Sequence, residues 1–258
     1  MDLTIFAILT QDGIASGAVY VLLALALVLV FSITRVIFIP LGEFLAFGAL
    51  TMAALQAGKV PNSAALLLIL GVATFLQELA GTMRSPAGQV NRTRAISLGM
   101  LKFVVLPAAV FLVAKSAEGA SWPMLAQLLL TFAIVAPMGP MIYRLAFQPL
   151  AESPVLVLVA VAVHLVLLGV GLVIFGAEGS RTTPFSDAVF NVGTLTISGQ
   201  SIVVIVTALL LIGALYLYFD RTLSGKALRA TAVNRRGARL VGIGTAQAGR
   251  LAFLLASF

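Results

Sequence analysis

The sequence has no cysteine among its 258 residues and a single histidine, His164. Without cysteine the chain can form no disulfide, no thiol nucleophile and no cysteine-ligated metal site. Charged residues are also scarce, at 10% of the chain, whereas hydrophobic residues make up 61% and the mean hydropathy is +1.13. This composition excludes an ordinary soluble domain and is typical of a protein that crosses a membrane several times.

Motifs for enzymatic chemistry are missing as well. The Gly225-Lys226 pair does not complete a phosphate-binding loop of the form Gly-x-x-x-x-Gly-Lys, because Asp220 occupies the position of the first glycine. There is no His-Glu-x-x-His motif, no Gly-x-Ser-x-Gly motif and no cluster of histidine with carboxylates. We therefore expect a chain that is not an enzyme, with no catalytic residue, no metal ion and no cofactor.

Long apolar runs dominate what is present. Seven runs are candidate spans and an eighth begins near the end of the sequence: Ile14–Thr34, Val36–Gln56, Val60–Leu79, Ile96–Ala114, Trp122–Tyr143, Pro154–Gly176, Ser201–Phe219 and Arg250–Phe258. The last run is too short to cross about 30 Å of hydrocarbon at about 1.5 Å per residue, so we expect truncation at the C-terminus. The sequence predicts an all-α, polytopic transmembrane helical bundle of about 7–8 spans.

The charges predict an orientation. Residues 220–242 hold six cations and one acid directly after an apolar run, which places this loop in the cytoplasm. Alternating back through seven spans puts the N-terminus outside, residues 82–95 in a cytoplasmic loop, thirteen cations inside and three outside. The net charge of +7 then reflects loops that face anionic membrane lipid, and we expect no nucleic-acid partner.

The second run contains a charged residue that is costly inside a membrane. Pro40 cannot donate a helical hydrogen bond and Gly42 loosens the same turn, so we expect a discontinuous or re-entrant helix near Pro40–Gly42. On an ideal helix Glu43 lies about 12 Å beyond Arg35, within the hydrocarbon. A carboxylate at that depth needs water, a partner or a cavity, which makes Glu43 either a pathway residue or the partner of a neighbouring helix.

His164 lies in the middle of an apolar run, far from any loop. An intramembrane histidine can relay protons or line a pathway, but it can equally be a neutral ring bonded to a nearby carbonyl. We include it among the candidate pathway residues with Pro40, Gly42 and Glu43.

The basic loop is also helix-prone. Lys226 to Asn234 contains good helix formers and no proline, and Gly225, Gly237 and Gly242 are expected to break the helix. Such a segment suits the docking of a soluble partner, although spacing alone also allows a solvated anchor.

Two stretches resemble one family, the permease subunits of ABC importers for branched-chain amino acids (leucine, isoleucine and valine). In the coupling loop, Arg236, Gly237, Ala238 and Gly242 occupy the family's Glu-Ala-Ala-x-x-x-Gly pattern, with Arg and Gly replacing the Glu and the first Ala. The lead Gly225-Lys226-Ala227-Leu228-Arg229-Ala230 is similar to the family's as well. Arg35 to Leu50 resembles a second family stretch. The resemblance covers roughly 13–57 and 143–258, and 60–120 has no assigned role.

The resemblance implies a single transmembrane permease domain over 1–258 in a bacterial inner membrane. It implies cytoplasmic ABC ATPase subunits that engage the coupling loop, 220–243, a second permease subunit, and a periplasmic solute-binding protein that delivers the substrate. Within that loop it points to Gly225, Arg229, Ala230, Arg236, Gly237, Ala238 and Gly242. Two alternatives are a proton-coupled secondary transporter that uses Glu43 and His164, and a membrane scaffold without a pathway.

Overall fold

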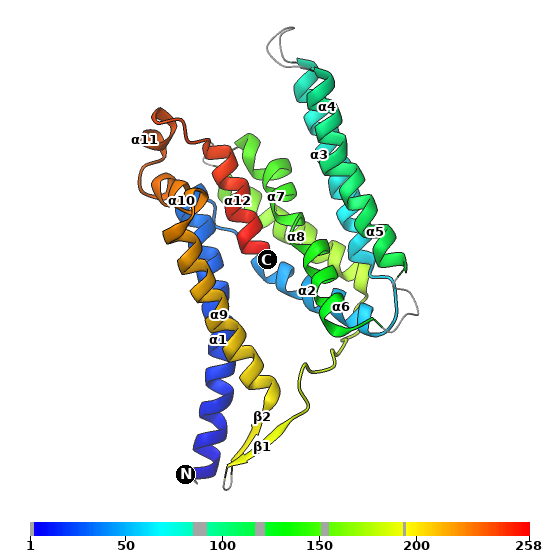
Figure 1. Cartoon of the computed structure of the whole chain (residues 1–258). Coiled ribbons are helices and arrows are strands. Elements are labelled where there is room, and N and C mark those ends of the chain that lie inside the picture. Colours follow the sequence, from blue (N-terminus) through cyan, green and yellow to red (C-terminus); the bar gives the residue numbers. More distant parts are fainter. Residues whose placement is uncertain (1–2, 85–91, 117–121, 151–154, 193–194) are drawn as a thin grey trace. The chain divides into compact units, whose positions relative to one another are not determined.

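The computed structural model describes residues 3–84, 92–116, 122–150, 155–192 and 195–258, and they pack as two compact units (Figure 1). Unit 1 comprises Met1–Ile33 and Thr183–Ala248, and unit 2 comprises Thr34–Thr182 and Gly249–Phe258. The sequence predicts one permease domain over 1–258, and the structure adds that its residues pack in these two units. Of the expected loop at 82–95, the flanking residues are helical and 85–91 lie outside the described residues.

Unit 1 is built from long helices and one hairpin. Its elements are α1 (Leu3–Thr34), β1 (Val189–Val192), β2 (Leu195–Ser198), α9 (Gly199–Arg221), α10 (Leu223–Val233), α11 (Arg235–Leu240) and the start of α12 (Thr245–Ser257). The two strands pair antiparallel, with Val189 opposite Ser198. The basic loop predicted at 220–243 is therefore two short helices that follow α9 directly.

The regular elements of unit 2 among its described residues are all helices. Unit 2 contains α2 (Leu41–Gln56), α3 (Asn62–Arg84), α4 (Arg92–Met100), α5 (Leu106–Ser116), α6 (Met124–Val135), α7 (Met138–Ile142), α8 (Leu156–Phe175) and most of α12. Two π-helical segments, Leu101–Val105 and Tyr143–Phe147, and a 3-10 turn, Gln148–Leu150, continue α4 and α7.

Prolines explain both π-helical segments. Pro107 and Pro149 have no N–H to donate to the carbonyl four residues earlier, so the local register shifts to bonds across five residues. The backbone N–H of Leu106 accordingly donates to the carbonyl of Leu101, and that of Gln148 to Tyr143. The two segments lie within continuous helical spans rather than ending them.

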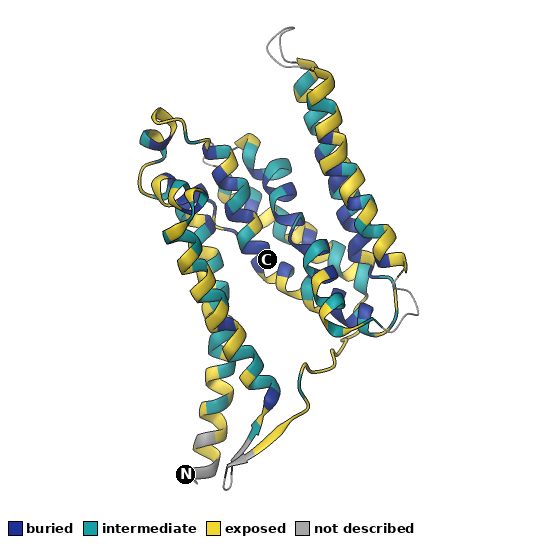
Figure 2. Cartoon of the chain, in the orientation of Figure 1, coloured by how far each residue is buried: buried dark blue, intermediate teal, exposed yellow. Residues whose placement is uncertain are grey.

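Six helical stretches in the described residues are long and apolar enough to cross a membrane: 8–34, 62–84, 92–116, 124–150, 156–175 and 199–221. The prediction of an all-α polytopic bundle is confirmed. The exposed surfaces of α1 and α9 carry large apolar side chains, among them Tyr20 and Leu210, as expected where a helix faces lipid (Figure 2). The expected span Val36–Gln56 consists of an extended lead followed by the sixteen-residue helix α2, which is about 24 Å long.

An aromatic cluster forms the centre of unit 2. Phe38, Phe147, Phe253 and Tyr143 are almost completely buried, and Phe253 of α12 contacts the other three at ring-centroid distances of 4.6, 5.5 and 4.8 Å respectively. Phe38 also packs against Phe44 of α2 at 5.5 Å. The cluster thus joins α12, the π-helical turn after α7, and the chain that leads into α2.

Close packing of α12 depends on small residues. Gly249 faces the ring of Tyr143 and Gly139 faces Ser257, so a Cβ at either glycine would collide with its neighbour. The carbonyl of Ala136 loses its helical donor because position 140 is proline, and the Ser257 hydroxyl donates to it instead at 2.8 Å. The C-terminal helix therefore satisfies a backbone group that the broken helix leaves open.

Candidate functional site

The chain break before α2 positions the first candidate site. α1 ends at Thr34, Arg35 takes a left-handed backbone with φ of 63°, and Pro40 precedes the first residue of α2. The interruption therefore occupies residues 35–40, and Gly42 lies inside the helix with open space around it, so the expectation that Gly42 loosens the break is wrong. The helical depth assigned to Glu43 is also wrong, because the residues between Arg35 and Pro40 are not helical.

Glu43 and His164 meet. Glu43 lies in the first turn of α2, and His164 lies in the middle of α8, which packs against α2. His164 Nδ1 lies 2.7 Å from Glu43 Oε1, and the side chains are 32% and 12% exposed respectively. The two residues that the sequence singles out for their polar character in apolar helices thus form one contact within unit 2.

The contact is electrostatic rather than a hydrogen bond. Its distance suits an ion pair, but the ring and the carboxylate are not aligned for a hydrogen bond, and Glu43 Oε2 has no hydrogen-bond partner among the described residues. A carboxylate oxygen and an imidazole nitrogen attract at this distance only when the nitrogen carries a proton. One carboxylate oxygen remains available to a donor that enters the site.

The second candidate site is the basic loop, where two polar residues begin the helices. Thr222 Oγ1 accepts a hydrogen bond from the backbone N–H of Gly225, and Asn234 Oδ1 accepts one from Gly237, both at 2.9 Å. Threonine and asparagine are favoured at these positions because they satisfy backbone donors that have no partner inside the helix. Thr222 and Asn234 were not among the predicted residues. Each lies three positions before a glycine of the loop, and this pattern of a capping residue could have predicted where the two helices begin.

The glycines of this loop have different roles from those predicted. Gly225 and Gly237 lie inside α10 and α11 and do not break them. Gly225 instead permits a close approach, because a Cβ there would lie 2.7 Å from the Cα of Phe219 at the end of α9. Only Gly242 ends a helical segment as expected, with φ of +85°.

The remaining loop residues separate into a buried and an exposed set. Ala238 is buried against its own chain, whereas Arg229, Ala230, Arg236 and Gly242 are exposed. Arg229 lies 3.8 Å from Asp220, an exposed pair that contributes little stability. A side chain larger than that of Ala238 would therefore disturb the loop itself before it reached any partner.

Exposed apolar side chains are the most distinctive feature of the loop. Leu223, Val233, Leu240 and Val241 are between 76% and 88% exposed on a segment that also carries several arginines. Exposed leucine and valine clustered in a short polar segment are typical of a surface that a partner protein or a membrane covers. Sequence inspection found the basic character of this loop and missed its apolar contact residues.

These features define a polytopic helical membrane protein with a buried polar contact between two helices and a helical, partly apolar loop. The model of the family "Branched-chain amino acid transport system / permease component" matches residues 89–258, about two thirds of the chain. The chain belongs to this family and is a permease component of a transport system. No curated protein and no solved structure matches it.

The family match extends and limits the resemblance seen in the sequence. It includes residues 89–142, which that resemblance left out, and it includes α8 with His164 and the whole basic loop. It does not include residues 13–57, so the likeness of the stretch around Glu43 stands on its residues alone.

Proposed function

We propose that the chain is the permease subunit of an ATP-driven importer in a bacterial inner membrane, for branched-chain or related amino acids. The observation that carries the proposal is the exposed apolar set on α10 and α11, within a region that matches the permease family. A chain without a nucleotide-binding motif needs a surface through which a partner can apply the work of ATP hydrolysis. Cytoplasmic ABC ATPase subunits grip this loop.

The proposed importer has further parts. A periplasmic solute-binding protein delivers the amino acid, and a second permease subunit completes the pathway. On this chain the pathway includes the start of α2, with Pro40, Gly42 and Glu43, and His164 of α8. The buried, unpartnered oxygen of Glu43 supports this placement, because a polar solute crossing an apolar bundle needs polar groups along its route.

Replacing Leu240 with aspartate tests the coupling role. The side chain is 88% exposed, so the variant is expected to insert and fold normally while losing apolar contact with the ATPase. We expect at least a tenfold fall in ATPase co-purification from detergent, with a matching fall in amino-acid uptake. Phe185→Asp, at an exposed position before β1, is the matched control and should keep the ATPase. If Leu240→Asp retains the ATPase and takes up amino acid as the unmodified chain does, the loop is a solvated anchor and not the coupling site.

The proposed topology has its own test in this cysteine-free chain. We expect Glu178→Cys, in the exposed segment after α8, to react with an impermeant maleimide in intact cells. Leu240→Cys should react only after the membrane is permeabilised, because the cation asymmetry places its loop inside. Ile5→Cys, near the N-terminus, should label from outside. Labelling of Leu240→Cys in intact cells would reverse the orientation.

The Glu43–His164 contact favours one second candidate, a proton-coupled secondary transporter. A carboxylate and an imidazole in contact inside a bundle can exchange a proton as the pathway opens. Uptake measured separately under ATP depletion and under collapse of the proton gradient distinguishes the two functions. The ATP-driven importer loses uptake in the first condition, and the secondary transporter loses it in the second.

A further inference from the structure

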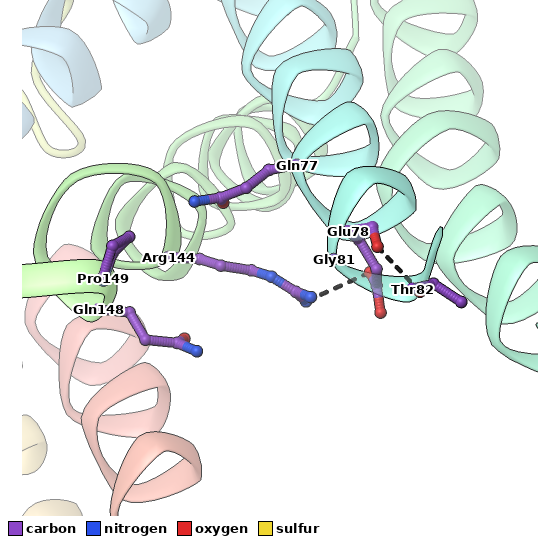
Figure 3. Close-up of a pocket in the computed structure, with 7 residues that line it drawn as sticks. All are labelled: Gln77, Glu78, Gly81, Thr82, Arg144, Gln148 and Pro149. Atoms are coloured by element: carbon purple, nitrogen blue, oxygen red, sulfur yellow. Dashed lines mark hydrogen bonds and ion pairs between the residues drawn. The ribbon is translucent and has the colours of Figure 1, made fainter. Parts of the chain in front are cut away.

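A polar pocket of about 330 Å³ lies in unit 2, between α3 and the turn that follows the second π-helical segment (Figure 3). It is unrelated to the Glu43–His164 contact. Five of the residues that line it have polar side chains, and the full lining is Gln77, Glu78, Gly81, Thr82, Arg144, Gln148 and Pro149. In an apolar membrane protein such a group of side chains needs either mutual pairing or a polar ligand.

The charges around the pocket do not cancel. Arg144 reaches across it to Glu78 (Figure 3), with 3.3 Å between Nη1 and Oε2. Its guanidinium also lies 5.0 Å from the ring centroid of Phe103. Gly249 of α12 packs against the ring of Tyr143, so the charge of the next residue, Arg250, lies near those of Arg144 and Glu78. Two guanidinium groups against one carboxylate leave one positive charge in excess, which favours an anionic ligand.

The hydrogen-bonding capacity of the pocket is also unfilled. Gln77 Oε1 and Gln148 Oε1 are buried without a hydrogen-bond partner among the described residues, whereas Glu78 Oε2 already lies in the ion pair with Arg144. Two such acceptors around one pocket are costly unless a ligand supplies donors. The ligand that fits both features is an anion that also carries hydroxyl groups.

The position of the pocket indicates where that ligand comes from. Gln77 to Thr82 lie in the last two turns of α3, and Gln148 and Pro149 close the span 124–150, so the pocket lies at the ends of two membrane-spanning stretches. Ends of spans lie at the level of lipid headgroups. Leu76, Met83 and Leu150, adjacent in sequence to the lining residues, expose apolar side chains that suit acyl chains. A basic pocket between spans at this level is a recognised form of anionic-lipid site.

We propose that this pocket binds the phosphoglycerol headgroup of an anionic phospholipid. Arg144 and Arg250 hold the phosphate, and the glycerol hydroxyls donate to the amide oxygens of Gln77 and Gln148. The bound lipid ties the end of α3 to the turn after α7 and to α12.

Lipid retention by the full chain in detergent, followed by native mass spectrometry, tests the proposal. The probes are dioleoyl phosphatidylglycerol, phosphatidic acid, which lacks the glycerol hydroxyls, and phosphatidylcholine, which has no net charge. We expect about tenfold stronger retention of phosphatidylglycerol than of phosphatidylcholine, with phosphatidic acid between them. Arg250→Gln, which keeps the Arg144–Glu78 pair, should reduce phosphatidylglycerol retention about tenfold. Arg84→Gln, at an exposed position outside the pocket, should not.

A second variant examines the hydroxyl contacts separately. Gln77→Leu combined with Gln148→Leu should abolish the preference for phosphatidylglycerol over phosphatidic acid while both remain better retained than phosphatidylcholine. Equal retention of all three lipids by the unmodified chain would overturn the proposal. Unchanged phosphatidylglycerol retention in both the Arg250 and the glutamine variants would do so as well. Displacement of the lipid by millimolar glycerol phosphate would contradict a lipid site and show that the pocket binds a soluble phosphate ester.

Discussion

Phe253→Ala is expected to lower the unfolding free energy of the permease by about 3 kcal/mol, more than any other single truncation that we consider. The ring is fully buried and contacts Phe38, Tyr143 and Phe147, so its removal leaves a cavity among rings that cannot close together. Phenylalanine-to-alanine changes in protein cores cost about 3–5 kcal/mol. We expect the lower end, because lipid is as apolar as the core and the lost contacts dominate.

The functional consequence is expected to be larger than the loss of stability alone. α12 continues the chain directly from the basic loop, and its Phe253 packs on Phe38, five residues before Glu43. If the loop is the site of ATPase coupling, the chain that leaves it continues into α12, which this cluster fixes to the residues before α2. Phe253→Ala should therefore uncouple ATP hydrolysis from uptake even at a temperature where the chain remains folded.

The measurement is thermal unfolding in detergent together with ATPase activity and uptake of the reconstituted importer. Phe6→Ala is the matched control, since it removes the same side chain from a helix where it is 60% exposed. Phe253→Leu should be intermediate because it fills most of the cavity. If Phe253→Ala is as stable and as well coupled as Phe6→Ala, the aromatic cluster has no role in coupling.

Glu43→Gln is expected to reduce uptake at least tenfold while the permease still assembles. Glutamine keeps the size of the side chain but removes the charge that attracts His164 at 2.7 Å and that offers its second oxygen to a passing solute. Both side chains retain some exposure, so the loss of stability should be smaller than the 3–5 kcal/mol of a fully buried pair. Uptake and thermal unfolding of the purified importer measure the two effects.

A double-mutant cycle separates pathway from scaffold. If the contact only holds α2 against α8, Glu43→Gln combined with His164→Gln should recover stability and uptake together, because two amides can pair without a charge. If Glu43 acts on the solute, the double variant should recover stability but not uptake. Wild-type uptake in both single variants would exclude the pair from the pathway. Ser63→Ala is the control. It removes a 2.7 Å hydrogen bond between Ser63 of α3 and Thr51 of α2, away from Glu43 and His164.

Local chemistry accounts for what could be predicted about the site. A carboxylate and an imidazole stand out in apolar runs because their burial is costly, so Glu43 and His164 were identifiable without a structure. The helical tendency of the basic loop was readable from its composition, but its boundaries were not. Those depend on Thr222 and Asn234, whose side chains begin a helix only when the chain turns there.

The sequence by itself determined that this is an all-helical, multi-pass membrane protein with a basic loop, since 10% charge and long apolar runs leave few other folds. Tertiary structure alone decided which residues meet. Helices that are apolar on every side, such as α1 and α8, give no periodic signal for the face that packs. The Glu43–His164 contact, the burial of Ala238 and the bond from Ser257 to the Ala136 carbonyl all join groups whose complementarity exists only once the helices are packed.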